Sequence, residues 1–160
     1  MFSWLKKNPA HLDENGLSKA VITDLNRNVR ALNDIPREHF TAICEAAARS
    51  VAGRALSTLS TELMKIDGMS ARRAGDIALL LANQAGVAIS NEQRLALGIE
   101  EARWRHSGAP CRTANLAHKA ANGQTYSIKK GMLIGGAHTW PGHAEGCKCS
   151  SQPITPGFEE

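Results

Sequence analysis

HTWPGHAEGCKC, residues 138–149, is the densest group of chemically specialised side chains in the chain. Two cysteines, Cys147 and Cys149, are separated by one residue, and glycines, a proline and two histidines precede them. Glycine and proline set special backbone conformations, whereas cysteine and histidine bind metals and act in nucleophilic catalysis. No repeat or low-complexity pattern accounts for this density. We therefore expect a compact C-terminal module built on this segment.

The residues before this segment predict a small sheet with one helix. Residues 101–106 alternate, which favours a strand with Ala102, Trp104 and His106 on one face. Asn122-Gly123 is a typical helix stop. The other expected elements are a short helix at 114–121, a second strand at 124–128, a long glycine-rich loop at 129–146 and a third strand at 147–154.

The first 98 residues predict helices. Apolar residues recur at three- and four-residue spacing from Leu17 to Leu32, which indicates an amphipathic helix. A second helix is expected from about Pro36 to about Ile66, with a bend at Gly53. A third is expected from the Ser70 cap to Leu97, with Gly98 just past its end. The fold class is therefore α+β, with a helical region at 1–98 and a small α+β module at 99–160.

Composition restricts the class of protein. Of the 160 residues, 42% are hydrophobic but only 4% are aromatic, so the core is built mainly from aliphatic side chains. The net charge of +4 allows contact with nucleic acid but is too low to indicate a dedicated DNA-binding protein. Four cysteines do not make a disulfide scaffold in a chain of this size. The longest apolar stretch, 77–89, is shorter than the roughly twenty residues of a membrane span, so we expect a soluble protein from a reducing cytoplasm.

Cysteine and histidine in the C-terminal module suggest a zinc site. Tetrahedral zinc needs four ligands, and Cys111, His143, Cys147 and Cys149 are the candidates. The C-x-C spacing is not the usual C-x2-4-C hairpin of a structural zinc site. A disulfide from Cys111 to either later cysteine, and reduced thiols without metal, both remain open.

An enzymatic interpretation uses the same region differently. His106 or His118 would act as the general acid or base of a small nuclease, with Arg105 or Lys119 on the phosphate. A cysteine thiolate activated by His138 or His143 is a second arrangement. The sequence contains no phosphate-binding loop, dinucleotide fingerprint or H-E-x-x-H motif.

Several of these residues, taken in order, resemble a known family. They are Trp104-Arg105-His106, then His118 with the run 122–126 (NGQTY), then the closing run 141–149 (PGHAEGCKC). Together with the helical stretch 71–97, they resemble the Mu F-like minor head proteins of tailed phages, also called phage head morphogenesis proteins. The resemblance covers about residues 71–154.

The resemblance implies a structural virion component of a phage or prophage, present near the portal and associated with head assembly, DNA packaging or DNA ejection. It implies portal or capsid proteins as partners, contact with viral DNA as a further interaction, and no established enzymatic activity. Such a protein resides in the bacterial host cytoplasm during assembly and then in the virion. The alternatives are a small nuclease or toxin-like RNase using His118 or His106, and a zinc-stabilised interaction module. The structural motif residues that the resemblance marks are Trp104, Arg105, His118, Gly123, Tyr126, Pro141, His143, Cys147 and Cys149.

Overall fold

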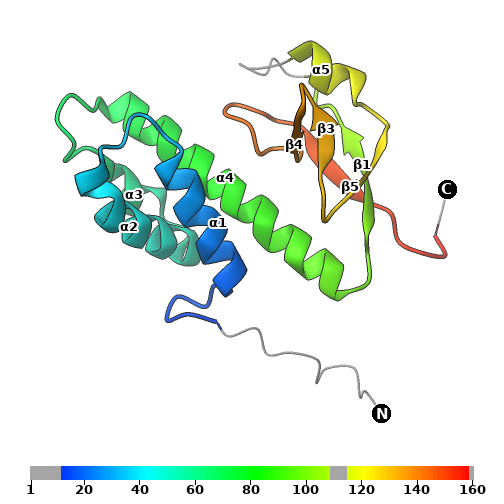
Figure 1. Ribbon diagram of the computed structural model, residues 1–160, viewed down its shortest axis with the longest axis horizontal. Helices are drawn as coiled ribbons and strands as arrows, with labels where there is room; N and C mark the ends of the chain where they lie inside the picture. The colour runs from blue at the N-terminus through cyan, green and yellow to red at the C-terminus, as the bar shows by residue number, and fades with distance from the viewer. Residues whose placement is uncertain (1–11, 109–114, 159–160) are drawn as a thin grey trace. The chain divides into compact units, whose positions relative to one another are not determined.

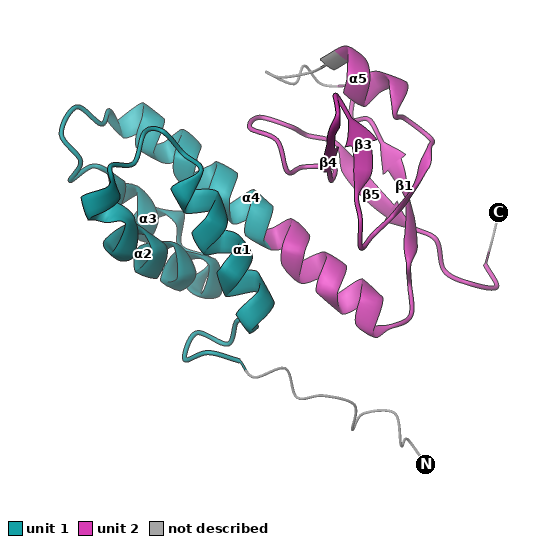
Figure 2. Cartoon of the chain, in the orientation of Figure 1, with its two compact units in different colours: residues 1–85 teal, residues 86–160 magenta. Residues whose placement is uncertain are grey.

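The computed structural model describes residues 12–108 and 115–158. The described residues form five α-helices and small antiparallel sheets (Figure 1), so the predicted α+β class is confirmed. The chain divides into two compact units, residues 1–85 and 86–160 (Figure 2). The division falls within helix α4 (Ala71–Ala96), whereas the change in sequence character suggested a boundary at 98/99.

The first helix, α1 (Lys19–Arg30), follows its predicted pattern. Val21, Leu25 and Val29 form one buried stripe at a spacing of four residues, so a single face of the helix enters the core. Ser18 caps the helix, because its hydroxyl oxygen accepts a hydrogen bond from the Val21 N–H at 3.2 Å.

The prediction of one continuous helix from about Pro36 to about Ile66 is wrong. The chain forms a short 3-10 turn (Arg37–His39), then α2 (Phe40–Gly53) and α3 (Leu56–Leu63). Arg54 adopts a left-handed conformation with φ of +52°, which ends α2 where only a bend at Gly53 was expected. Buried Ser50 secures this ending: its hydroxyl donates to the Ala55 carbonyl oxygen at 2.8 Å, and the Ala55 N–H donates to the Ser50 carbonyl oxygen at 3.0 Å.

The core of the first unit is aliphatic. One ion pair also joins two of its segments, because Arg73 near the start of α4 donates to both Asp34 carboxylate oxygens, at 3.0 and 2.8 Å. Ser70 caps α4 as expected, by accepting the Arg73 N–H at 3.1 Å. The most deeply buried large side chains of this unit are Leu25, Val29, Ile43, Leu59, Leu63, Ile77 and Leu81.

The second unit is built on a three-stranded antiparallel sheet. Strand β1 (Glu101–Arg105) lies in the centre, between β2 (Thr125–Ser127) and β5 (Ser150–Pro153). Ala102 and Trp104 are buried on one face of β1, as the alternation predicted. The short helix α5 (Asn115–Ala120) precedes β2 in the chain.

The loop expected at 129–146 contains a hairpin that sequence reasoning did not predict. Strands β3 (Met132–Ile134) and β4 (Ala137–Thr139) pair across a two-residue turn of Gly135 and Gly136. Both glycines have positive φ, +61° and +82°, which a tight hairpin turn of this kind requires. The last strand, β5, begins at Ser150, so Cys147 and Cys149 lie in the segment before it and not within a strand as predicted.

The core of the second unit differs in composition from that of the first. It contains aromatic rings and thiols beside a few aliphatic side chains, and Arg94 of α4 donates to the Ser151 hydroxyl at 2.8 Å, which ties the end of that helix to β5. The buried core residues are Ala102, Trp104, Ala121, Tyr126, Ile128, Met132, Cys147 and Cys149.

Candidate functional site

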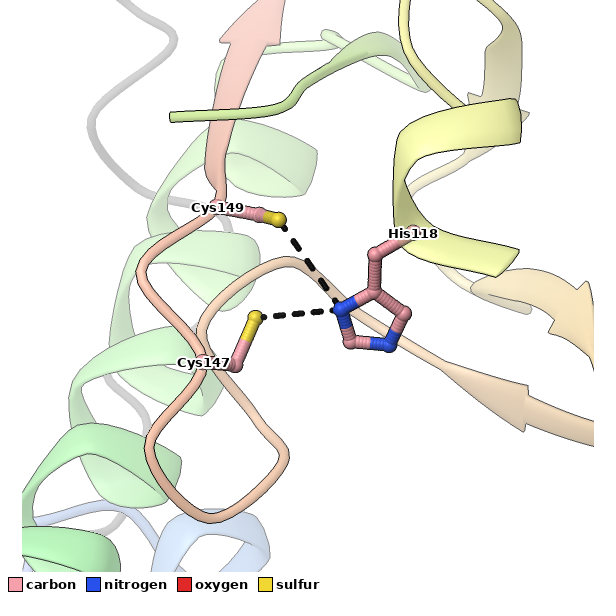
Figure 3. Close-up of side chains that lie close together, drawn as sticks. All are labelled: His118, Cys147 and Cys149. Carbon is pink, nitrogen blue, oxygen red and sulfur yellow. Dashed lines mark hydrogen bonds between the residues drawn. The ribbon is translucent and has the colours of Figure 1, made fainter. Parts of the chain in front are cut away.

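His118, Cys147 and Cys149 meet inside the second unit (Figure 3). The Nδ1 atom of His118 lies 3.4 Å from the Cys147 Sγ and 3.8 Å from the Cys149 Sγ. All three potential ligand atoms lie within 4.8 Å of one another. The side chains are 2%, 6% and 6% exposed, respectively, so the cluster is part of the core rather than of the surface.

Helix α5 supplies the histidine. Among the side chains described on this short helix, His118 alone is buried, while Leu116 and Lys119 face solvent. The end of the helix is fixed to the sheet, because the Gly123 N–H donates to the Trp104 carbonyl oxygen at 2.8 Å. The Trp104 ring packs edge-on against the imidazole, with ring centroids 5.1 Å apart. These contacts orient the His118 ring toward the sulfurs.

The closing loop supplies the two thiols. Cys147 and Cys149 are buried while Lys148 between them is exposed, so an extended segment directs both sulfurs inward. Gly142, in a left-handed conformation with φ of +81°, directs its backbone N–H to the Cys147 Sγ at 3.4 Å. Buried Pro141 precedes this turn. The run 141–149 therefore acts as a single loop that places two sulfurs beside one ring nitrogen.

Burial sets the charge state of the histidine. Removal from solvent lowers the pKa of His118 below its ordinary value, and the nearby His106 lowers it further. The ring is therefore a neutral imidazole at neutral pH, which is the form that binds metal ions.

The donor set matches one kind of chemistry better than the others. Two sulfurs and an imidazole nitrogen are typical ligands of Zn²⁺ and of other soft or borderline metals. A nucleophilic thiol needs access to its substrate, and these thiols are almost fully enclosed. In the part of the chain that the structure describes, no Asp or Glu joins the three side chains to orient the imidazole.

The residues of the nuclease hypothesis do not form one site. Arg105 is exposed and its Nε donates to the Gln152 side-chain oxygen at 2.6 Å. Strand alternation puts Arg105 on the face of β1 opposite Trp104, and Trp104 contacts His118. His106 is near enough to affect the pKa of His118, but its Nδ1 accepts the Gly108 N–H at 3.1 Å.

The remaining predicted ligands lie elsewhere. His143 packs against Trp140, with ring centroids 5.9 Å apart, and is not a member of the cluster that contains the two cysteines. His138 is exposed on β4. Cys111 lies outside the described residues. Cys44, in the first unit, is half-buried, and burial raises the pKa of its thiol.

Sequence reasoning named His118 as a motif residue and as a catalytic candidate, but not as a metal ligand. The sequence feature that pointed to His118 was the order of elements in the family resemblance: a strand, then a short helix with a histidine, then a closing C-x-C pair. That order does not state which of four histidines in the module faces the cysteines.

Comparison of the chain with protein-family models, with curated proteins and with solved structures finds no match. Among the described helices, none combines the length and the apolar character that crossing a bilayer requires.

Proposed function

We propose that this chain is a minor head protein of a tailed phage or prophage, a structural component that docks at the portal or on the inner capsid. The observation that carries the proposal is the placement of the motif residues behind the family resemblance. Trp104, His118, Tyr126 and the pair Cys147 and Cys149 come from four separate segments, and all are buried in the second unit. Residues used in this way maintain a shape, as a docking module requires.

The hydrogen bonds of the motif residues support the same role. The Tyr126 hydroxyl donates to the Ser151 hydroxyl oxygen at 2.5 Å across the sheet, and the Gly123 N–H is used to join α5 to β1. Each of these groups is therefore occupied in connecting elements of the unit. In this proposal the protein contributes to head assembly, DNA packaging or ejection, acting first in the host cytoplasm and then in the virion.

A nuclease is the rival function, and the geometry gives it less support. Its central histidine is 2% exposed and faces two sulfurs rather than an open cleft. The cation assigned to the phosphate, Arg105, lies on the other face of the strand. A hydrolytic site needs an acid–base group within hydrogen-bond reach of bound substrate.

Co-expression with the portal protein of the same genome tests the proposal. Size-exclusion chromatography with light scattering should give a complex of defined stoichiometry, and an unrelated portal protein should not co-elute. A monomer that stays alone across a range of salt and protein concentrations would contradict the proposal.

A nuclease assay with RNA and single-stranded DNA is the companion experiment. Intact substrate after prolonged incubation is the expected result. Cleavage that disappears in His118→Ala, while the variant keeps its far-ultraviolet circular dichroism, would favour the rival function.

A further inference from the structure

We infer that His118 Nδ1, Cys147 Sγ and Cys149 Sγ supply three of the four ligands of a tetrahedral zinc ion that joins helix α5 to the closing loop of the second unit. Cys147 and Cys149 follow His118 by 29 and 31 residues in the sequence, respectively. The site differs from the ligand set expected from the sequence, because His118 takes the place of His143, and the fourth candidate, Cys111, lies outside the described residues. This inference does not rest on the proposed role in the phage head.

The interatomic distances fit a shared metal ion. With Zn–N of about 2.0–2.1 Å, Zn–S of about 2.3 Å and a tetrahedral angle, a nitrogen and a sulfur bound to one zinc lie roughly 3.6 Å apart. The two observed nitrogen–sulfur distances, 3.4 and 3.8 Å, lie on either side of that value. Small movements of the three side chains therefore bring all three ligand atoms to bonding distance of one ion.

Hydrogen bonding alone explains the cluster less well. A neutral imidazole nitrogen carries either one lone pair or one proton, so Nδ1 can form one good hydrogen bond at a time. Both sulfurs nevertheless approach this same nitrogen. A metal ion at the common centre accounts for both approaches, because it accepts a lone pair from each ligand.

Charge balance also favours zinc in this enclosed position. Binding releases one proton from each thiol, so Zn²⁺ with two thiolates and a neutral imidazole has no net charge. A neutral group avoids most of the free-energy cost of burying an isolated ion. The Gly142 N–H, 3.4 Å from the Cys147 Sγ, supplies the kind of outer hydrogen bond that stabilises and orients a metal-bound thiolate.

Metal analysis of the full-length protein tests the inference. We expect the reduced protein, purified without chelator, to carry one zinc ion per chain by mass spectrometry. Replacement by Co²⁺ should give the strong visible bands of a tetrahedral ion and a near-ultraviolet sulfur-to-cobalt charge-transfer band. Reduced, folded protein that lacks zinc and gives no such spectrum would overturn the inference, as would a disulfide linking Cys147 to Cys149 in freshly purified protein.

Variants assign the ligands. Cys147→Ser and Cys149→Ser should each weaken Co²⁺ binding by more than about 100-fold, because even changes in the outer shell cost about 10–100-fold. His118→Cys keeps a ligand at that position and should retain binding with a stronger charge-transfer band, even if His118→Ala fails to fold. Cys44→Ser, in the other unit, is the matched control and should keep the wild-type spectrum.

Two outcomes of the variant series would contradict the assignment. Unchanged Co²⁺ spectra in both Cys147→Ser and Cys149→Ser would remove these thiols from the site, and loss of the spectrum in Cys44→Ser would place the thiolates elsewhere. A metal-free protein that still co-elutes with its portal protein would contradict the zinc site and would support the proposed function.

Discussion

The two units of this protein bury different kinds of side chain. The helical unit packs Leu, Ile, Val and Ala at the spacing of amphipathic helices, and Phe40 is the one aromatic residue in its described part. The second unit buries Trp104 and Tyr126 around a histidine and two thiols. The first core depends on the area removed from water, whereas the second also depends on polar atoms whose partners must be in place.

This difference gives the two units separate sensitivities. An aliphatic core responds mainly to changes in volume, and a metal or a reductant leaves it unaffected. A core that contains a cluster of metal-binding atoms gains or loses stability when a ligand binds. The units also have separate spectroscopic probes once Trp4 of the first unit is replaced by Phe, since Trp104 and Trp140 then report on the second unit and most described helical residues lie in the first.

The largest expected effect is that of Trp104→Ala. Trp104 is fully buried and packs against both His118 and Tyr126, so its removal should lower the free energy of unfolding by about 3–5 kcal/mol. Urea denaturation followed by the fluorescence of Trp140, in a chain that also carries Trp4→Phe, measures the loss. Trp104→Phe, which keeps a ring in the core, should cost less. A near-neutral result for the alanine variant would show that Trp104 is not part of the core, and would contradict the difference in core composition between the two units.

The second-largest expected effect is that of metal removal, which should lower the stability of the second unit more than that of the first. Zinc at 100–1,000 times its dissociation constant stabilises the bound state by about 2.7–4.1 kcal/mol, which a chelator should remove. Tryptophan fluorescence should therefore show unfolding at lower urea, with a smaller change in the circular dichroism at 222 nm. Equal shifts of both signals would mean that the units unfold together and that their cores are not independent.

A volume change in the helical core should have an intermediate effect. Ile43 on α2 is fully buried, so Ile43→Val should cost about 0.5–1.5 kcal/mol through the loss of one methylene group. The effect should be the same with and without chelator when unfolding is followed at 222 nm. A chelator-dependent cost would mean that the stability of this core depends on the proposed zinc site in the other unit.

The smallest expected effect concerns the ion pair of the helical unit. Hydrogen bonds from Arg73 lower the pKa of Asp34 below 3.8. The carboxylate therefore contributes stability above that pH, and the contribution is lost as the pH falls through the lowered value in the folded protein. Both side chains are about one-third exposed, at 31% and 33%, which limits the effect to less than about 1 kcal/mol.

Asp34→Asn measures that contribution. The variant should be slightly less stable than the wild type at pH 7, and the difference should shrink below pH 3.8, where the wild-type carboxylate gains a proton. Urea titrations at 222 nm across this range check the sign. A difference that grows on acidification would contradict the assigned role of the pair.

The sequence predicted the helices of the first unit to a useful extent. The periodicity of Val21, Leu25 and Val29 fixes the buried face of α1, and Ser70 marks the start of α4. It did not predict that α2 ends at Gly53, because an apolar stripe continues through Leu59 and Leu63 in α3. The deciding interactions, a left-handed Arg54 and the hydroxyl of buried Ser50, involve a conformation that composition does not reveal.

The candidate site was predicted less completely. The C-x-C pair and the strand of Ala102 and Trp104 stand out locally, but the histidine beside the sulfurs does not. His143 is nearer to the cysteines in sequence, and yet its ring packs against Trp140.

The sequence by itself determined the α+β class and most helix faces. These features depend on local periodicity, because apolar residues repeat about every 3.6 positions along a helix face and every 2 positions along a strand face. Only the tertiary structure decided that His118, and not a nearer histidine, meets Cys147 and Cys149. That choice depends on how the sheet, α5 and the closing loop pack around Trp104, and contacts across some thirty residues leave no periodic trace in the sequence.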